Sequence, residues 1–287
     1  MKAMVLAAGF GTRLRPYTLL RPKPLFPVLD RPLILRLIDQ LRENGFHSIL
    51  VNCHHLKEQI VDALGACENI HLQEEPIELG TGGGMRMAMD FFGSGPVLVT
   101  NGDIFHTIDL AAVYQGHYNS GADATLVLHD YPRFNKVALG PDGNITDFDG
   151  GDGQRWAFTG IQVLDPALLA IIPPGVFYNI IDCYRYWIEH GKKIRGSIVR
   201  NQYWTDMGTP QDYLDLHRTL LTREPFKGKT PFYRGEGVSV PDDFEQADWL
   251  CLGSNVRVGR QSRLERTVVW DGAVVPDGTR LSDTIIS

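Results

Sequence analysis

The sequence is poor in the features that mark secreted, membrane and nucleic-acid-binding proteins. Its four cysteines, Cys53, Cys67, Cys183 and Cys251, lie far apart and form no C-x-x-C pair, which argues against a disulfide framework and a cysteine zinc site. No apolar run approaches the roughly 18 residues that a spanning helix needs. No long basic run occurs, and the formal net charge is −6, so the composition does not indicate a nucleic-acid surface.

The first ten residues begin like a signal peptide but lead to no cleavage site. Lys2 precedes a short apolar run, and glycines and arginines from Gly9 onward interrupt the run before any small-residue cleavage site. We therefore expect a buried strand at this position. We also expect a cytoplasmic protein that binds neither a membrane nor nucleic acid. The 287 residues permit one large domain, or a large domain with a smaller one.

Strand-like and helix-like segments alternate along the first hundred residues. Apolar runs predict strands at 3–8, 48–52, 70–73 and 96–100, and periodic patterns predict helices at 32–45 and 55–64. A glycine-rich turn at 80–84 is predicted to lead into a further helix at 85–92. The alternation predicts an α/β fold, with a Rossmann-like, mixed but mostly parallel sheet flanked by helices. Ligands of such sheets bind beyond the carboxyl ends of the strands, so we expect the Gly9 loop and Asp103 to share one rim.

The last part of the chain has a different period. Val258, Leu264, Trp270 and Pro276 recur every six residues, and Val268 and Val274 keep the same step. This spacing predicts coils of a parallel β-helix, and the alternative is a β-rich extension with coincidental spacing. Two or three coils are few for independent stability. We therefore expect the tail to pack on the main domain or on another subunit.

The loop after the first strand carries glycines and cations. "GFGTRL", residues 9–14, begins like a dinucleotide fingerprint, but Leu14 stands where its third glycine belongs, and no Gly-Lys-[Ser/Thr] follows. Arg13, Arg15 and the nearby Lys23 remain. Together with backbone N–H groups, such cations can hold a triphosphate. The alternative is that they are solvated loop residues.

Two aspartates follow strand-like segments in turns. Asp103 comes after "PVLVTNG" and Asp206 lies in "YWTDMGTP". Mg²⁺ is usually held by one or two carboxylates together with phosphate oxygens and water, so this pair suggests a magnesium site beside the cationic loop. Each aspartate taken alone is also typical of a turn or a helix cap.

The ordered set of motifs resembles one enzyme family. "LAAGFGTRLRPYTLLRPKPL", "LGTGGG", "NGD" and "WTDMGT" are similar to motifs of the sugar-1-phosphate nucleotidyltransferases, and the likeness extends from Met1 to about Leu220. The tail "TVVWDGAVVPDGTRLSDTIIS" resembles the left-handed β-helix that several members carry. In this family a sugar 1-phosphate attacks the α-phosphorus of a nucleoside triphosphate (NTP), and pyrophosphate leaves.

The resemblance implies a role for each matching residue. The residues implied to bind the NTP are Ala8, Gly9, Gly11, Thr12, Arg13, Lys23, Gly80, Thr81 and Gly82. Arg13 and Lys23 would also be catalytic, because they neutralise charge at the α-phosphate. Asp103 and Asp206 fall on the family's Mg²⁺ ligands, and Thr159 and Gly160 match the segment that lines the sugar pocket.

One family motif is missing. Many members carry Glu-Lys-Pro before the sugar-binding strand, and its lysine grips the sugar phosphate. Here the stretch reads "DFDGGDG", with Asp149 near the place of the acid and Gly150 near that of the lysine. We hypothesise that Lys136, the nearest basic residue on the adjoining segment, makes the phosphate contact instead. The alternative is a solvated turn lysine.

The resemblance also divides the chain and narrows its function. It implies a catalytic domain at 1–222, a linker at 223–250 and a β-helix segment at 251–287, through which the chain can form a homo-oligomer. The β-helix and "LGTGG" favour a mannose- or heptose-1-phosphate guanylyltransferase. The missing Glu-Lys-Pro, with "TGGG" and "FTGI", also fits an N-acetylmuramate 1-phosphate uridylyltransferase. A non-catalytic nucleotide-sugar-binding relative is the alternative of another class. A nicotinamide-dependent dehydrogenase is disfavoured by Leu14.

Overall fold

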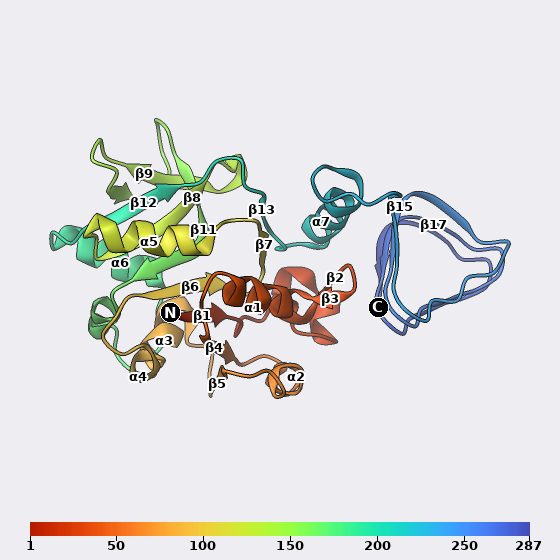
Figure 1. Cartoon of the computed structure of the whole chain (residues 1–287), viewed down its shortest axis with the longest axis horizontal. Coiled ribbons are helices and arrows are strands. Elements are labelled where there is room, and N and C mark those ends of the chain that lie inside the picture. The colour runs from red at the N-terminus through yellow and green to blue at the C-terminus, as the bar shows by residue number, and fades with distance from the viewer. The chain divides into compact units, whose positions relative to one another are not determined.

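The computed structural model describes all 287 residues and divides into two compact units. The sheet unit consists of Met1–Phe10 and Leu37–Trp204, and the coil unit consists of Gly11–Arg36 and Thr205–Ser287. Figure 1 follows the chain through both units. The chain therefore passes from one unit to the other between Phe10 and Gly11, in the middle of the glycine-rich loop.

The sheet unit is built around one mixed sheet. Its strands pair in the order β10-β9-β11-β6-β1-β4-β5, β8 pairs with β11, and β12 pairs with β8. The strands are β1 (Lys2–Leu6), β4 (Ser48–Cys53), β5 (Ile70–Glu74), β6 (Val97–Asn101), β8 (Ala124–His129), β9 (Asn135–Leu139), β10 (Ile145–Asp147), β11 (Trp156–Leu164) and β12 (Ile194–Ile198). The run β6-β1-β4-β5 is parallel, whereas β11 runs antiparallel to β6, β8 and β9.

Helices cover this sheet, so the predicted mixed α/β sheet is confirmed. The helices are α1 (Leu33–Glu43), α2 (Lys57–Leu64), α3 (Gly80–Met87), α4 (Met89–Phe92), α5 (Leu110–Ser120) and α6 (Ile180–Glu189), with α7 (Pro210–Thr222) in the coil unit. Helix α5 packs on β8 and β11, α6 packs on β10 and β12, and α2 packs on β5. The predicted helices at 32–45 and 55–64 correspond to α1 and α2, with shorter ends.

The apolar strands place their following loops at one rim. Ala3, Met4 and Val5 of β1 have no exposed surface, as expected for a strand covered on both faces. Leu6, the last residue of β1, pairs with Asn101 at the end of β6, so both strands finish at the same edge. The prediction that the Gly9 loop and Asp103 share a rim is confirmed.

The predicted turn at Gly80–Gly84 is wrong, because these residues form the first part of α3. The N–H groups of Gly82 and Gly83 both donate to the carbonyl of Tyr178, at 2.8 and 3.3 Å. A Cβ atom on Gly83 would lie 2.5 Å from the Val176 carbonyl oxygen. The glycines therefore allow a helix to lie directly against another backbone segment, and this packing overrides their low helix propensity.

The C-terminal part of the coil unit is a stack of parallel strands (Figure 1). Its strands are β14 (Phe232–Arg234), β15 (Glu245–Leu252), β16 (Arg257–Val258), β17 (Arg263–Val269), β18 (Val274–Val275) and β19 (Arg280–Ile286). Glu245 pairs with Arg263, which pairs with Arg280, so each coil takes 17 or 18 residues, about three steps of six. Strand β14 and most of β15 lie within 223–250, the segment predicted as a linker.

The six-residue pattern identified only part of the coil interior. Val258 and Leu264 are buried inside the coils, whereas Val274 is 63% exposed and its neighbour Val275 is the buried residue. Trp270 is 3% exposed but is not part of the coil core. None of the helices has the length and hydrophobicity that crossing a membrane requires.

Helix α7 of the coil unit contains a buried histidine that bonds two backbone groups. Nε2 of His217 accepts the N–H of Leu29 at 3.1 Å, so Nδ1 carries the proton and donates to the Tyr213 carbonyl at 3.0 Å. Burial lowers the pKa of His217 to about 4, and the backbone hydrogen bond opposes that shift only in part. The ring is therefore neutral in the folded protein at neutral pH.

We expect His217 to make the free energy of unfolding depend on pH. Between its unfolded pKa of 6.5 and its folded pKa of about 4, the unfolded chain binds a proton that the folded chain does not, so stability falls as pH decreases through this window. His217→Gln should flatten this dependence by on the order of 3 kcal/mol, measured by urea unfolding at several pH values. The exposed His47→Gln is the control. Equal pH slopes for His217→Gln and the wild type would contradict the assignment.

Candidate functional site

The first turn of the glycine-rich loop is held by a buried polar chain. The N–H of Ala7 donates to Oδ1 of Asn52 at 2.7 Å, and Nδ2 of Asn52 donates to Oε1 of Glu75 at 2.6 Å. Oε2 of Glu75 in turn accepts the N–H of Leu79 at 3.3 Å. This chain connects the end of β1 to the start of α3. Ala8, the next residue of the loop, is buried, and Gly9 is exposed.

Glu75 is the charged group of this chain and is only 2% exposed. Burial raises the pKa of Glu75, and the hydrogen bond from Asn52 opposes that rise. A Cβ atom on Gly84 would lie 2.6 Å from Oε1 of Glu75, so Gly84 provides the space for the carboxylate. Sequence reasoning missed Asn52 and Glu75 as site residues. The signal in the sequence that could have found them is their place: Asn52 lies near the end of the apolar strand β4, and Glu75 directly follows β5.

The predicted NTP residues Gly80, Thr81 and Gly82 lie at the start of α3. Gly80 has a φ of +68°, which a glycine adopts without strain. The hydroxyl of Thr81 accepts the N–H of Ile180 at 3.1 Å, and Gly82 is buried. Thr81 thus contacts the first residue of α6, and Gly82 contacts Tyr178 just before that helix. Their part in NTP binding stays a prediction.

The turn after β6 carries Asp103, which is half-buried. The N–H of Gly102 donates to the Leu6 carbonyl at 2.8 Å, which ties this turn to the end of β1. Gly160, in the bulge of β11, has a φ of +82°, and a Cβ atom there would lie 2.5 Å from Nδ2 of Asn101. The structure therefore brings Gly160 of the predicted sugar segment against the segment that carries Asp103.

Thr159 has a structural role in the same bulge. Its side chain is buried, donates to the Val127 carbonyl at 2.9 Å and accepts the N–H of Ile161 at 3.2 Å. The hydroxyl is therefore engaged by the backbone of the sheet. Thr159 can therefore influence a bound ligand by stabilising the bulge of β11.

Lys136 on β9 lies beside Gly150, the residue predicted to stand near the place of the missing lysine. The N–H of Gly150 donates to the Lys136 carbonyl at 3.1 Å, and a Cβ atom on Gly150 would lie 4.0 Å from Cγ of Lys136. The Lys136 side chain is exposed. Asp149 forms an ion pair with Arg185 of α6. The two predicted sugar-phosphate residues, Lys136 and Asp149, are therefore close to Gly150, and their part in binding stays a prediction.

In the coil unit, Lys23 and Arg13 converge on Asp206. Nζ of Lys23 lies 3.2 Å from Oδ1 of Asp206, and Nη2 of Arg13 lies 3.6 Å from Oδ2. Lys23, in a 3-10 turn (Lys23–Leu25), is 6% exposed, whereas the Arg13 side chain is 58% exposed. A lysine buried this deeply requires a carboxylate partner, because an unpaired buried charge is very costly.

Glycines make room for this group. A Cβ atom on Gly208 would lie 2.7 Å from Oδ2 of Asp206 and 3.1 Å from the Arg13 guanidinium. Gly11 has a φ of +60°, and its carbonyl accepts the hydroxyl of Thr18 at 3.1 Å. Thr12 is exposed at the start of a 3-10 turn (Thr12–Leu14). The structure therefore brings Arg13, Lys23 and Asp206 together beside the exposed part of the loop.

The donor set bears on the predicted cofactor. No three or more His, Cys, Asp or Glu side chains are gathered in a way that could hold a metal ion. Asp103 belongs to the sheet unit and Asp206 to the coil unit. Each of them is a carboxylate, a ligand type that fits Mg²⁺, since this ion is usually held by one or two carboxylates together with water and phosphate oxygens.

Comparisons with known proteins agree on the family. Residues 2–223 match the sequence model of the family described as nucleotidyl transferase. A UTP–glucose-1-phosphate uridylyltransferase of Synechocystis sp. is 30% identical over 250 residues, which cover 78% of this chain and 64% of that protein. An N-acetylmuramate alpha-1-phosphate uridylyltransferase of Neisseria meningitidis is 34% identical over 220 residues, 73% of this chain and 94% of that protein.

Two further similarities cover more of the chain. A mannose-1-phosphate guanylyltransferase of Mycobacterium tuberculosis is 29% identical over 297 residues, which cover 97% of this chain and 80% of that protein. A crystal structure from Bacillus anthracis, described as a glucose-1-phosphate thymidylyltransferase in complex with sucrose, has the same fold with a TM-score of 0.69. It is 22% identical and covers 80% of this chain and 98% of that one. The chain belongs to the nucleotidyl transferase family, and its curated relatives are sugar-1-phosphate nucleotidyltransferases.

Proposed function

We propose that this protein transfers a nucleoside monophosphate from an NTP to a sugar 1-phosphate and releases pyrophosphate. The observation that carries the proposal is the convergence of Lys23 and Arg13 on Asp206 beside the glycine-rich loop. Two cations that converge beside a glycine-rich loop favour the binding of a polyphosphate. The functions of the named relatives support the same reaction.

The reaction needs alignment more than a strong base, because its nucleophile is already an anion. An oxygen of the sugar 1-phosphate forms a bond to the α-phosphorus, and the bond from the α-phosphorus to the bridging oxygen of pyrophosphate breaks. We propose that Lys23 and Arg13 neutralise charge on the transferred group. Ala8, Gly9, Gly11 and Thr12 bind the triphosphate.

We propose Asp103 and Asp206 as the ligands of Mg²⁺. When bound, the ion would add positive charge at the α-phosphate and help to orient the phosphates. Asp206 already pairs with Lys23 and Arg13. A phosphate bound by these two cations would therefore lie next to the Asp206 carboxylate and to an ion held by it. The half-buried position of Asp103 in its turn leaves a carboxylate at the rim of the sheet.

The sugar side is proposed to lie along β9 and the bulge of β11. Lys136 binds the sugar phosphate in place of the missing lysine, and Thr159 and Gly160 shape the pocket through the backbone of the bulge. Asp149 lies at its edge, paired with Arg185. Gly80, Thr81 and Gly82, which form the start of α3, are proposed to face the base of the NTP.

The substrates are proposed to be those of a mannose- or heptose-1-phosphate guanylyltransferase. The support is that the match to the Mycobacterium tuberculosis guanylyltransferase covers 97% of this chain, and therefore includes coil residues. The N-acetylmuramate alpha-1-phosphate uridylyltransferase matches over 73% of the chain, and a uridylyltransferase is the alternative. A few hydrogen bonds distinguish guanine from uracil.

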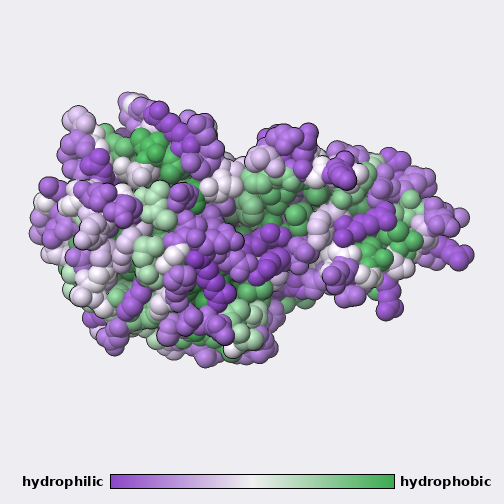
Figure 2. All heavy atoms as spheres, viewed as in Figure 1, coloured by the Kyte–Doolittle hydropathy of each residue, from purple (hydrophilic) through white to green (hydrophobic).

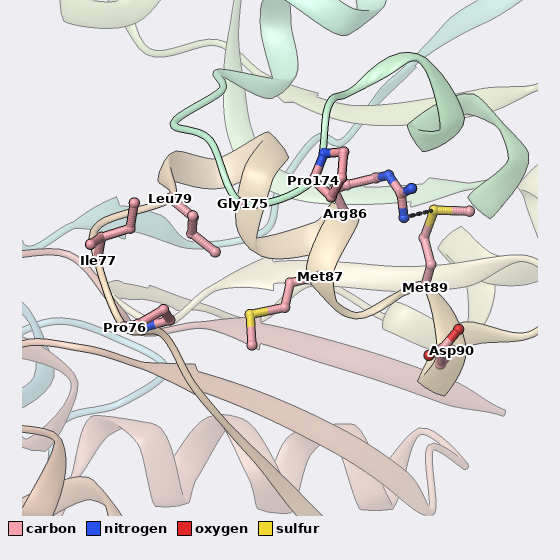
Figure 3. A pocket seen from close by; sticks show the side chains of 9 residues that line it. All are labelled: Pro76, Ile77, Leu79, Arg86, Met87, Met89, Asp90, Pro174 and Gly175. Carbon is pink, nitrogen blue, oxygen red and sulfur yellow. Dashed lines mark hydrogen bonds between the residues drawn. The ribbon is translucent and has the colours of Figure 1, made fainter.

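We also propose that the coils form a left-handed β-helix that follows a catalytic domain at 1–222 and contributes to a homo-oligomer. Apolar side chains are exposed on the last coil, where Val274 is 63% and Leu281 43% exposed. Figure 2 shows hydrophobic residues among hydrophilic ones on the surface of the coils, at the right of the view. Strand β19 pairs with β17 and lies at the edge of its sheet, an arrangement that a second copy can cover.

The function is tested by a panel of NTPs and sugar 1-phosphates, each incubated with and without Mg²⁺. We expect pyrophosphate release that requires both substrates and the metal, fastest with GTP and mannose or heptose 1-phosphate. UTP with N-acetylmuramate 1-phosphate as the fastest pair would support the alternative substrate. If no pair of substrates gives pyrophosphate, the result would contradict the proposed enzymatic activity and favour a nucleotide-sugar-binding protein.

Asp103→Asn should reduce kcat by at least about 100-fold while the melting temperature changes little, because the change removes a charge and keeps the shape. Asp152→Asn, an exposed aspartate of the same unit, is the matched control and should keep full activity. Asp206→Asn is a less direct test, since it would leave the buried Lys23 without its carboxylate. A near-normal kcat for Asp103→Asn would rule out its assignment to the metal.

Lys136→Ala should raise the KM for sugar 1-phosphate about tenfold and leave the KM for NTP within about twofold, because one charge-assisted contact is lost. Lys193→Ala removes an exposed lysine of the same unit and serves as the control. Steady-state kinetics with each substrate varied in turn measures both constants. An unchanged KM for sugar phosphate would show that Lys136 is a solvated residue.

A further inference from the structure

The segment Gly11–Arg36, which carries Arg13 and Lys23, belongs to the coil unit and packs directly on its coils. The central contact is Trp270, which directly follows β17 and is 3% exposed. Its ring lies 4.7 Å from that of Phe26, edge to face, and the Arg21 guanidinium lies 4.8 Å above its ring. Both partners are within four residues of Lys23.

A buried hydrogen-bond chain fixes the same contact. Nε1 of Trp270 donates to the hydroxyl of Tyr213 at 3.1 Å, and that hydroxyl donates to the Pro27 carbonyl. Tyr213 lies on α7 and has no exposed surface. Each polar group of this chain therefore has its partner, and displacing Pro27 would leave a buried hydroxyl without an acceptor.

The other side of Lys23 is held as well. Asp271 accepts two hydrogen bonds from Arg21, at 2.9 and 3.3 Å. The hydroxyl of Tyr17 donates to the Ile285 carbonyl of β19 at 3.3 Å. The coils thus contact Tyr17 and Arg21 before Lys23 and Phe26 after it, and Tyr213 of α7 contacts Pro27. A fixed lysine with its chain held on both sides is a preorganised cation.

We propose that Trp270 and Tyr213 are positioning residues, which hold Lys23 where the transferred phosphoryl group is bound. We name Trp270, Tyr213 and Phe26 the aromatic clamp. In this proposal the coils affect catalysis only through Trp270, which contacts the segment around Lys23. The proposal rests on the proposed nucleotidyl transfer. Small displacements of a catalytic cation reduce turnover strongly, because alignment provides much of the rate.

Trp270 does not support the coils themselves. The coil interior is formed by Leu250, Leu252, Val256, Val258, Leu264, Val269 and Val275. The Trp270 ring lies outside this cluster, against Phe26 and Tyr17, whose rings are 4.7 and 6.0 Å away. A change at Trp270 should therefore act on the segment around Lys23 and leave the stack of coils in place.

The test compares Trp270→Leu with Val258→Ala, a change inside the coils. Two readouts are measured below the melting temperature of every variant: hydrogen–deuterium exchange of residues 17–28, and steady-state pyrophosphate release. For Trp270→Leu we expect faster exchange of 17–28, a kcat about tenfold lower and an unchanged KM for sugar 1-phosphate. Val258→Ala should change neither exchange of this segment nor kcat by more than about twofold.

Milder variants keep the test valid where Trp270→Leu does not fold. Trp270→Phe keeps the ring contact with Phe26 but loses the N–H donor to Tyr213, so its kcat should lie between those of Trp270→Leu and the wild type. Tyr213→Phe removes the hydroxyl and should have a similar effect.

Each outcome separates the clamp from the proposed reaction. If the wild type releases no pyrophosphate with any substrate pair, the proposed function fails, and exchange of 17–28 still reports on the clamp. Unchanged exchange in Trp270→Leu would show that the clamp does not hold the segment. Faster exchange with a normal kcat would overturn the positioning role.

Discussion

The buried ion pair of Lys23 and Asp206 is the constraint on which the candidate site depends. Lys23 is 6% exposed, so its charge is tolerable only beside a carboxylate, and Asp206 provides one at 3.2 Å. The partner comes from a distant part of the chain, at the end of β13 (Trp204–Asp206). Two separate segments of the family-matched region, 11–36 and 205–223, therefore belong to one compact unit together with the coils.

A second requirement is space for close approach. Gly84 makes room for Glu75, Gly160 for Asn101 and Gly208 for the carboxylate of Asp206. At each position the nearest atom would lie less than 3.0 Å from an added Cβ atom, so a larger residue would force the segments apart. These glycines are thus needed for close contacts between protein segments.

Local patterns predicted much of the fold, and they failed where packing decided the outcome. The apolar runs of β1 and β6 correctly predicted a shared rim, because buried parallel strands end at the same edge. The GTGGG segment was predicted as a turn, although the carbonyl of Tyr178 holds it as a helix. Coil residues before Cys251 were missed. Their six-residue signal was present in Phe232, Val238, Phe244 and Leu250, all of which pack in the coil core.

The sequence by itself determined the parallel strands β1, β4, β5 and β6, helices α1 and α2, the coil period and the motifs that carry the family resemblance, since these depend on residues near one another in the chain. Only the tertiary structure decided which distant groups meet. It joined Asn52 to Glu75, two cations to Asp206, and Trp270 to Phe26. The physical reason is that burial imposes these pairings: a charge, a hydroxyl or an aromatic ring removed from water must find a partner, and folding determines which partner is within reach.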